Sequence, residues 1–226
     1  MKINIPENLN EITIKQYFDF KKVADLTQDE NTLRLSLITI FCKLSINDVR
    51  NNFTTQEFNE VSNHLNELLQ KEPQFINKFT INGIDFGFIP NLDEMTAGEY
   101  IDLDSYTSNE DTYLEAMAVM YRPIKGKFKD LYNIEPYEGA EKYKDLMNDA
   151  PLNAYLGAMV FFYNLSNELL IATQSYFNQE TEETKVLESV LMKNGVGISQ
   201  FIQSLEETSL NVKMLQERIF TSSSLF

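Results

Sequence analysis

The 226-residue sequence has no tryptophan, one cysteine and one histidine, and its 19 lysines and arginines face 34 aspartates and glutamates. The single cysteine, Cys42, excludes an internal disulfide framework and is compatible with a reducing compartment. The formal net charge of −15 predicts a chain that nucleic-acid phosphates and anionic membrane surfaces repel. The most apolar segment, 150–163, is interrupted by Asn153 and is too short to span a bilayer. These shortages argue against a DNA-wrapping or membrane-bound protein.

What the sequence does contain is enough apolar material for a core, with 43% hydrophobic residues including 16 Phe and 11 Tyr. Two short β-patterned runs within 79–89 are joined by Asn82-Gly83, the strongest short-range hairpin signal. Pro90 ends the second run because it has no N–H for a sheet. We therefore expect a small antiparallel hairpin at this place.

Capping signals and apolar spacing predict helices along most of the remaining chain. The expected helices cover 13–26, 32–44, a short stretch from Ser45, 54–73, a short stretch from Thr96, 110–121 and 151–176. The expected fold class is mainly α (α+β). We expect a mainly helical body, 1–177, followed by a helical C-terminal extension, 178–226, with a glycine hinge at 195–197.

No residue pattern in the sequence points to catalysis, a cofactor or a metal site. His64 lacks a second His or thiol at metal-ligand spacing, and Cys42 lies in an apolar run typical of a buried thiol. The three acids Glu135, Glu138 and Glu141 are the candidates for paired carboxylates of a hydrolase. In an acidic protein, however, acids in a loop are more commonly solvated surface residues. We expect no enzyme, no cofactor and no metal.

Contacts with other proteins are the better prospect, because Tyr, Phe and Arg are enriched at interfaces. Arg122 has two open interpretations: a buried, structural ion pair with an acidic partner such as Asp93 or Glu94, and an interface anchor. Phe86 and Phe88 are either contact residues or core, since alternate strand positions face opposite sides. The candidate contact residues are Phe86, Phe88, Tyr121, Arg122, Phe220, Leu225 and Phe226.

Five segments carry a resemblance to a known family: EITIKQY (11–17), IFCKLS (40–45), INGIDFGFIPNLDEMTAGEYIDLDSY (81–106), AMAVMYRPI (116–124) and APLNAYLGAMVFFYNL (150–165). They resemble small structural proteins encoded by tailed phages, including crAss-like phages of Bacteroidetes. The resemblance covers roughly residues 11–170 and brings no catalytic residue with it.

The resemblance implies a virion protein in the portal-proximal neck or tail, assembled in the host cytoplasm. Its expected partners are its own copies, in a ring of about twelve, together with the portal protein and other tail rings. DNA would pass through without specific binding, and no membrane would be involved. A tail-assembly chaperone that leaves before the particle is complete is the alternative, and the Glu135–Glu141 hydrolase is a third.

Overall fold

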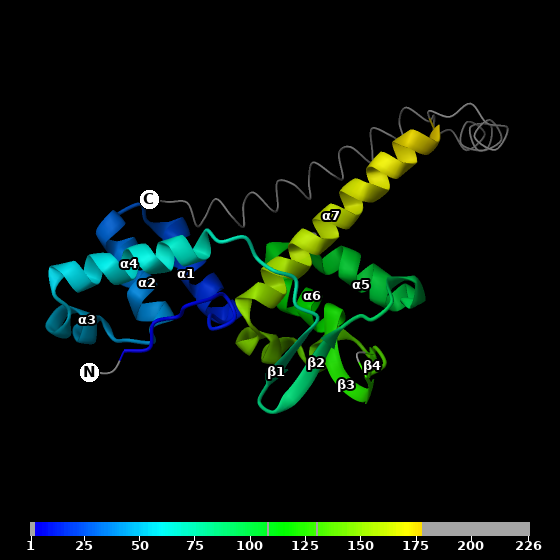
Figure 1. Cartoon of the computed structure of the whole chain (residues 1–226), viewed down its shortest axis with the longest axis horizontal. Helices are drawn as coiled ribbons and strands as arrows, with labels where there is room; N and C mark the ends of the chain where they lie inside the picture. The colour runs from blue at the N-terminus through cyan, green and yellow to red at the C-terminus, as the bar shows by residue number, and fades with distance from the viewer. Residues whose placement is uncertain (1–2, 108, 130, 178–226) are drawn as a thin grey trace. The chain divides into compact units, whose positions relative to one another are not determined.

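The computed structural model describes residues 3–107, 109–129 and 131–177. The chain divides into two compact units, of which the first ends at Gly157 and the second begins at Ala158. The fold is α+β, with mainly helical structure and a small antiparallel sheet, as the sequence predicts (Figure 1). The predicted extension, 178–226, and its hinge at 195–197 lie outside the described residues, and the predicted boundary after residue 177 stays a prediction.

The first unit begins with four helices. They are α1 (Ile14–Leu26), α2 (Glu30–Phe41), α3 (Ile46–Asn52) and α4 (Thr55–Leu69). Three of them, α1, α3 and α4, begin at the capping residues that the sequence predicts. Capping boxes formed by Thr13 with Gln16, Ser45 with Asp48, and Thr54 with Glu57 supply hydrogen bonds to the free N–H groups of α1, α3 and α4. Helix α2 packs against the other three, and its buried face consists of Leu33, Leu37, Ile38 and Phe41.

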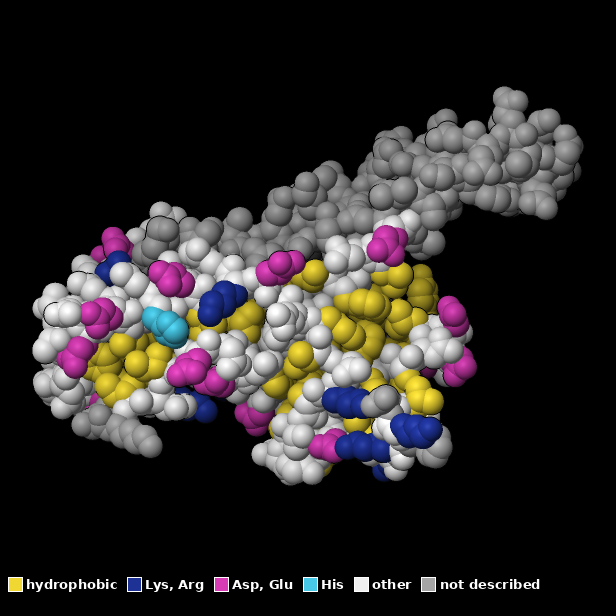
Figure 2. Space-filling view, viewed as in Figure 1, with side chains coloured by type: hydrophobic (Ala, Val, Ile, Leu, Met, Phe, Trp, Pro, Cys, Tyr) yellow, Lys and Arg dark blue, Asp and Glu magenta, His cyan; other side chains and the backbone are white. Residues whose placement is uncertain are grey.

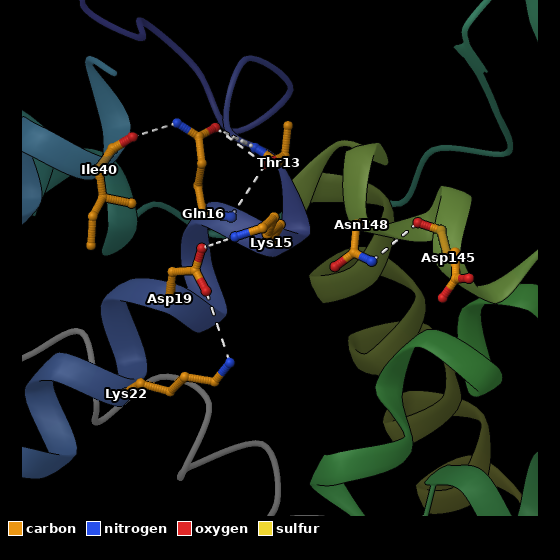
Figure 3. A network of polar contacts seen from close by, with 8 residues as sticks. All are labelled: Thr13, Lys15, Gln16, Asp19, Lys22, Ile40, Asp145 and Asn148. Atoms are coloured by element: carbon orange, nitrogen blue, oxygen red, sulfur yellow. Dashed lines mark hydrogen bonds and ion pairs between the residues drawn. The ribbon is translucent and has the colours of Figure 1, made fainter. Parts of the chain in front are cut away.

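Gln16 joins two of these helices through one side chain (Figure 3). Its Oε1 accepts the backbone N–H of Thr13 at 3.0 Å, which completes the cap of α1. Its Nε2 donates to the backbone oxygen of Ile40 at 2.7 Å, near the C-terminal end of α2. An amide fits this place because it offers both an acceptor and a donor, whereas a carboxylate offers acceptors alone.

The sheet has the order β1 (Lys78–Ile81), β2 (Ile84–Phe88), β3 (Tyr121–Phe128) and β4 (Leu131–Ile134), and every neighbouring pair is antiparallel. The predicted hairpin is confirmed as β1 and β2, with positive φ angles of 50° at Asn82 and 78° at Gly83. Strand β2 ends two residues before Pro90, as expected. The sheet is larger than predicted, because β3 and β4 extend the hairpin.

The predicted helix over about 110–121 is confirmed in its central part and is shorter at both ends. A short 3₁₀ turn, η2 (Glu110–Thr112), precedes α6 (Tyr113–Met120), and the backbone at Tyr121 is already extended, with φ −121° and ψ 122°. Pro123 favours this outcome because a residue before proline avoids the helical region. The earlier helix from Thr96 is confirmed as α5 (Ala97–Thr107), preceded by the turn η1 (Leu92–Glu94).

Two 3₁₀ turns, η3 (Ala140–Lys142) and η4 (Lys144–Asp149), lead into the long helix α7 (Leu152–Phe177). Both turns contact α6, and η4 also contacts α1. The start of α7 is tied to the start of α1, since Leu152 N–H donates to Ile12 O at 2.8 Å and Ile14 N–H donates to Ala150 O at 3.0 Å. Among the largest fully buried side chains of the first unit are Ile12, Leu37, Leu65, Phe86, Met117, Tyr121 and Met147.

Candidate functional site

Three of the predicted contact residues lie in an aromatic cluster formed by strands β1, β2 and β3. Phe86 and Tyr121 are fully buried and Phe88 is 4% exposed. The Phe79 and Phe86 rings stack with centroids 5.7 Å apart, and Phe88 meets Tyr121 edge-on at 5.2 Å. The Tyr121 hydroxyl donates to the backbone oxygen of Ile76 at 2.7 Å, and burial raises the pKa of this phenol. Phe86 and Phe88 are therefore core residues, the second of the two roles that the sequence left open, and the burial of Tyr121 corrects its prediction as a contact residue.

Arg122 is also buried, at 6% exposure, and forms an ion pair with Glu99 of α5. The Tyr137 ring lies 5.5 Å from its guanidinium carbon, and the Tyr137 hydroxyl donates to Asp102 Oδ2 at 2.5 Å. The geometry selects the structural interpretation of Arg122, a buried ion pair with an acidic partner, and that partner is Glu99 and neither of the two examples, Asp93 and Glu94. The reason is that Glu99 lies on the buried side of α5, whereas Asp93 and Glu94 are exposed on η1.

Glu99 has two sets of partners that keep its buried carboxylate charged. Burial by itself would raise the pKa of this carboxyl, but hydrogen bonds from Thr96, which include its backbone N–H at 2.7 Å, and the charge of Arg122 lower it overall. The Nε of Arg122 has no hydrogen-bond partner among the described residues. The pair therefore fixes α5 against β3 at a substantial desolvation cost.

The carboxylate group proposed for the hydrolase alternative lies after β4. Glu135 accepts from the Tyr143 hydroxyl, and its Oε1 lies 3.0 Å from Lys142 Nζ and 3.3 Å from Lys125 Nζ. Hydrogen bonds from Tyr143 and then from Lys142 lower the pKa of the Glu135 carboxyl to about 2. A general acid needs the opposite shift, so Glu135 does not fit the role of proton donor.

The other two acids of that group are solvated. Glu138 and Glu141 are 71% and 80% exposed, and they form ion pairs with Lys142 and Lys144. Exposed pairs of this kind contribute about 0–1 kcal/mol. The three carboxylates therefore form no shared buried site.

The surroundings of His64 and Cys42 fit structural roles and not catalytic ones. The His64 Nε2 lies 2.9 Å from the backbone oxygen of Pro6. Burial raises the pKa of the Cys42 thiol to about 11, so the thiolate that a nucleophile needs is scarce at neutral pH. Within residues 3–107, 109–129 and 131–177, no group of three or more His, Cys, Asp or Glu side chains is placed to hold a metal ion.

Two exposed surfaces remain that combine charge with large apolar side chains. The α5 surface consists of Asp93 and Glu94 on η1 and of Tyr100 and Ile101 on α5, which are 65% and 63% exposed. The turn surface consists of Lys125, Lys127, Lys129 and Leu131 at the connection of β3 to β4, and Leu131 is 73% exposed. Figure 2 shows basic side chains gathered over this end of the sheet.

Sequence reasoning did not single out either surface, although one signal for the second is visible. Lysine recurs at every second position from Lys125 to Lys129, in a chain that is poor in basic residues. The remaining predicted contact residues, Phe220, Leu225 and Phe226, lie outside the described residues.

None of the helices within the described ranges has both the length and the apolar character that crossing a membrane requires.

No protein-family model, no curated protein and no solved structure matches the chain.

Proposed function

We propose that this protein is a structural component of a tailed-phage particle, without enzymatic activity, that works by contacting its own copies in a ring. The ring belongs to the portal-proximal neck or tail and connects the portal to other tail rings. The resemblance over residues 11–170 supports this role. The protein is assembled in the host cytoplasm and retained in the virion.

The observation that carries the proposal is the exposure of Tyr100 and Ile101 side by side on α5, at 65% and 63%. Single exposed apolar residues are ordinary, but adjacent large ones on one helix surface are typical of protein–protein contacts. The neighbouring side chain of Leu103 is buried, so α5 already has a separate face that packs against its own unit. The exposed pair is therefore available to a partner.

The acidic composition fits a ring through which DNA passes. With a net charge of −15, the surface repels phosphates, so the genome would slide through without specific contacts. A ring subunit also needs two different surfaces that meet by rotation, because a self-complementary surface would give a closed dimer instead.

The test has two parts. Light scattering of the purified full chain, alone and with a portal protein, measures the mass of the assembly, and mass spectrometry of purified particles measures its copy number. We expect a defined homo-oligomer and a stoichiometric amount in the particle. A chain absent from particles but bound to newly made tail protein would instead be the assembly chaperone. A chain that is monomeric under every condition, including in the particle, would contradict the proposal.

A further inference from the structure

Charge of opposite sign is separated along the central part of this chain. From Phe79 to Tyr121 the sequence holds no lysine or arginine, and its acids are Asp85, Asp93, Glu94, Glu99, Asp102, Asp104, Glu110, Asp111 and Glu115. From Arg122 to Lys129 it holds no acid, and its basic residues are Arg122, Lys125, Lys127 and Lys129. A strongly acidic chain thus has one compact basic region.

The exposed parts of these two regions include the α5 surface and the turn surface. Arg122 and Glu99 are paired in the interior, whereas Asp93 and Glu94 are exposed on the first surface and three lysines on the second. Asp104 and Asp111 are also exposed, and Asp85 lies beside Lys127. Helix α5 and the tip of β3 and β4 lie apart in the first unit (Figure 1). One copy therefore presents an acidic, apolar surface and a basic, apolar surface at separate places.

The present partner of Lys127 is weak enough to be exchanged. Lys127 pairs with Asp85, and their side chains are 52% and 45% exposed, so the pair contributes about 0–1 kcal/mol. Lys125 is itself 60% exposed, although its partner Glu135 is only 14% exposed. A contact that also covered Leu131 would gain the burial of apolar area in addition to the exchanged charge pairs.

We propose that the turn surface of one copy binds the α5 surface of the next copy, head to tail. This inference rests on the proposed ring and identifies the two surfaces that meet in it. Opposite charges would fix the orientation of two molecules that otherwise repel each other, and Leu131 would pack near Tyr100 and Ile101. A contact between two different surfaces closes into a ring when its rotation closes.

Charge reversal of the full chain tests this contact by sedimentation velocity at low salt. Lys125→Glu with Lys127→Glu gives a variant with two acidic surfaces, and Asp93→Lys with Glu94→Lys gives a variant with two basic surfaces. We expect each variant alone to associate at least about tenfold more weakly than the unaltered chain, because like charges then meet. Added salt should weaken the association of the unaltered chain.

Mixing the two variants is the decisive measurement. Each variant supplies the charge that the other needs, so the mixture should regain association, which a defect in folding would not do. Controls with the same change in charge are Lys22→Glu with Lys71→Glu, and Asp25→Lys with Glu72→Lys, all at exposed positions of the helices α1 to α4 and their ends. The controls should associate like the unaltered chain.

Two results would overturn the inference, and they differ in what they say of the ring. If both reversed variants associate as the unaltered chain does, the two assigned surfaces do not form the contact, but the proposed self-assembly is not contradicted. If the unaltered chain is monomeric at every concentration and salt tested, both the inference and the proposed ring fail. Loss of association in the controls as well would show a general effect of charge and would equally contradict the assigned surfaces.

Discussion

The ring of Tyr132 lies directly over Gly87, so that a Cβ at Gly87 would stand 2.9 Å from Cδ2 of that ring and closer still to Cε2. The Tyr132 hydroxyl donates to the backbone oxygen of Phe88 at 2.8 Å and to that of Asn77 at 3.2 Å. Strand β4 thereby reaches across β3 and holds the first hairpin. The absence of a side chain at Gly87 is what makes this crossing possible.

We expect Gly87→Ala to lower the free energy of unfolding by about 1–3 kcal/mol, the usual cost of overpacking. The added methyl forces the Tyr132 ring away and breaks its hydrogen bonds. Urea unfolding measures the loss, and the same substitution in a Tyr132→Ala background is the control, where it should cost much less. An equal cost in both backgrounds would show that the ring is not the obstacle.

Two helical glycines should respond to alanine with opposite signs. A Cβ at Gly157 in α7 would lie 2.5 Å from Gln74 O and 2.8 Å from Phe75 Cα, whereas at Gly98 in α5 the nearest atom is Thr96 Oγ1 at 4.0 Å. Alanine gains up to about 1 kcal/mol over glycine in a helix. We expect that gain, or part of it, for Gly98→Ala.

For Gly157→Ala the clash with backbone outweighs the gain in helix propensity, so we expect a net loss of about 1–3 kcal/mol. The segment before β1 would have to move, and with it the bond from Gln74 N–H to Asn153 Oδ1 at 2.8 Å. Thermal unfolding of the two variants side by side provides the comparison. A higher melting temperature for Gly157→Ala would contradict the close approach.

Gln16→Glu tests whether the double role of Gln16 depends on its amide. The carboxylate would still accept from Thr13 and would gain about 0.3–1 kcal/mol near the helix N-terminus. It would also place an acceptor against Ile40 O and lose a buried donor, at about 1–3 kcal/mol. We expect a net loss in urea unfolding. Glu57→Gln, at the equivalent position of the α4 cap, is the control and should lose only the favourable charge near the helix N-terminus, about 0.3–1 kcal/mol.

The buried pair of Arg122 and Glu99 should be costly to break and cheap to replace. Glu99→Leu alone leaves an unpaired guanidinium in the interior, and we expect it to lower the free energy of unfolding by about 3–5 kcal/mol. Glu99→Leu with Arg122→Met removes both charges and should restore most of that stability. If the double variant is as unstable as the single one, the hydrogen bonds around the pair, and not its charges, hold α5 in place.

The stability of the first unit should fall in acid partly through Glu135. Because the folded pKa of this carboxyl is about 2, below its ordinary value of 4.5, its contribution is fully present above about pH 4.5. That contribution should be lost as the pH falls from 4.5 towards 2. Glu135→Gln should flatten the dependence of the unfolding free energy on pH in this window, whereas the exposed control Glu138→Gln should leave it unchanged. Parallel curves for both variants would show that Tyr143 and the two lysines do not hold Glu135 ionised.

The sequence alone determined the features that depend on neighbouring residues. Asn82-Gly83 specified the first hairpin because both positions need a positive φ, and the capping boxes placed the starts of α1, α3, α4 and α5. The apolar run after Pro151 likewise specified α7. Local backbone preferences act within a few residues, so they can be predicted from the sequence without knowledge of the fold.

The tertiary structure decided which side chains are inside and which partners they meet. Strand β3 was not predicted because the irregular register between Ile124 and Gly126 breaks the alternation of a strand in its middle. The sequence suggested Asp93 or Glu94 as examples of a partner for Arg122, but in the folded chain Arg122 pairs with Glu99 of α5. The tertiary structure also buries Phe86, Phe88 and Tyr121. Burial depends on segments that are distant along the chain, and no local pattern records how those segments meet.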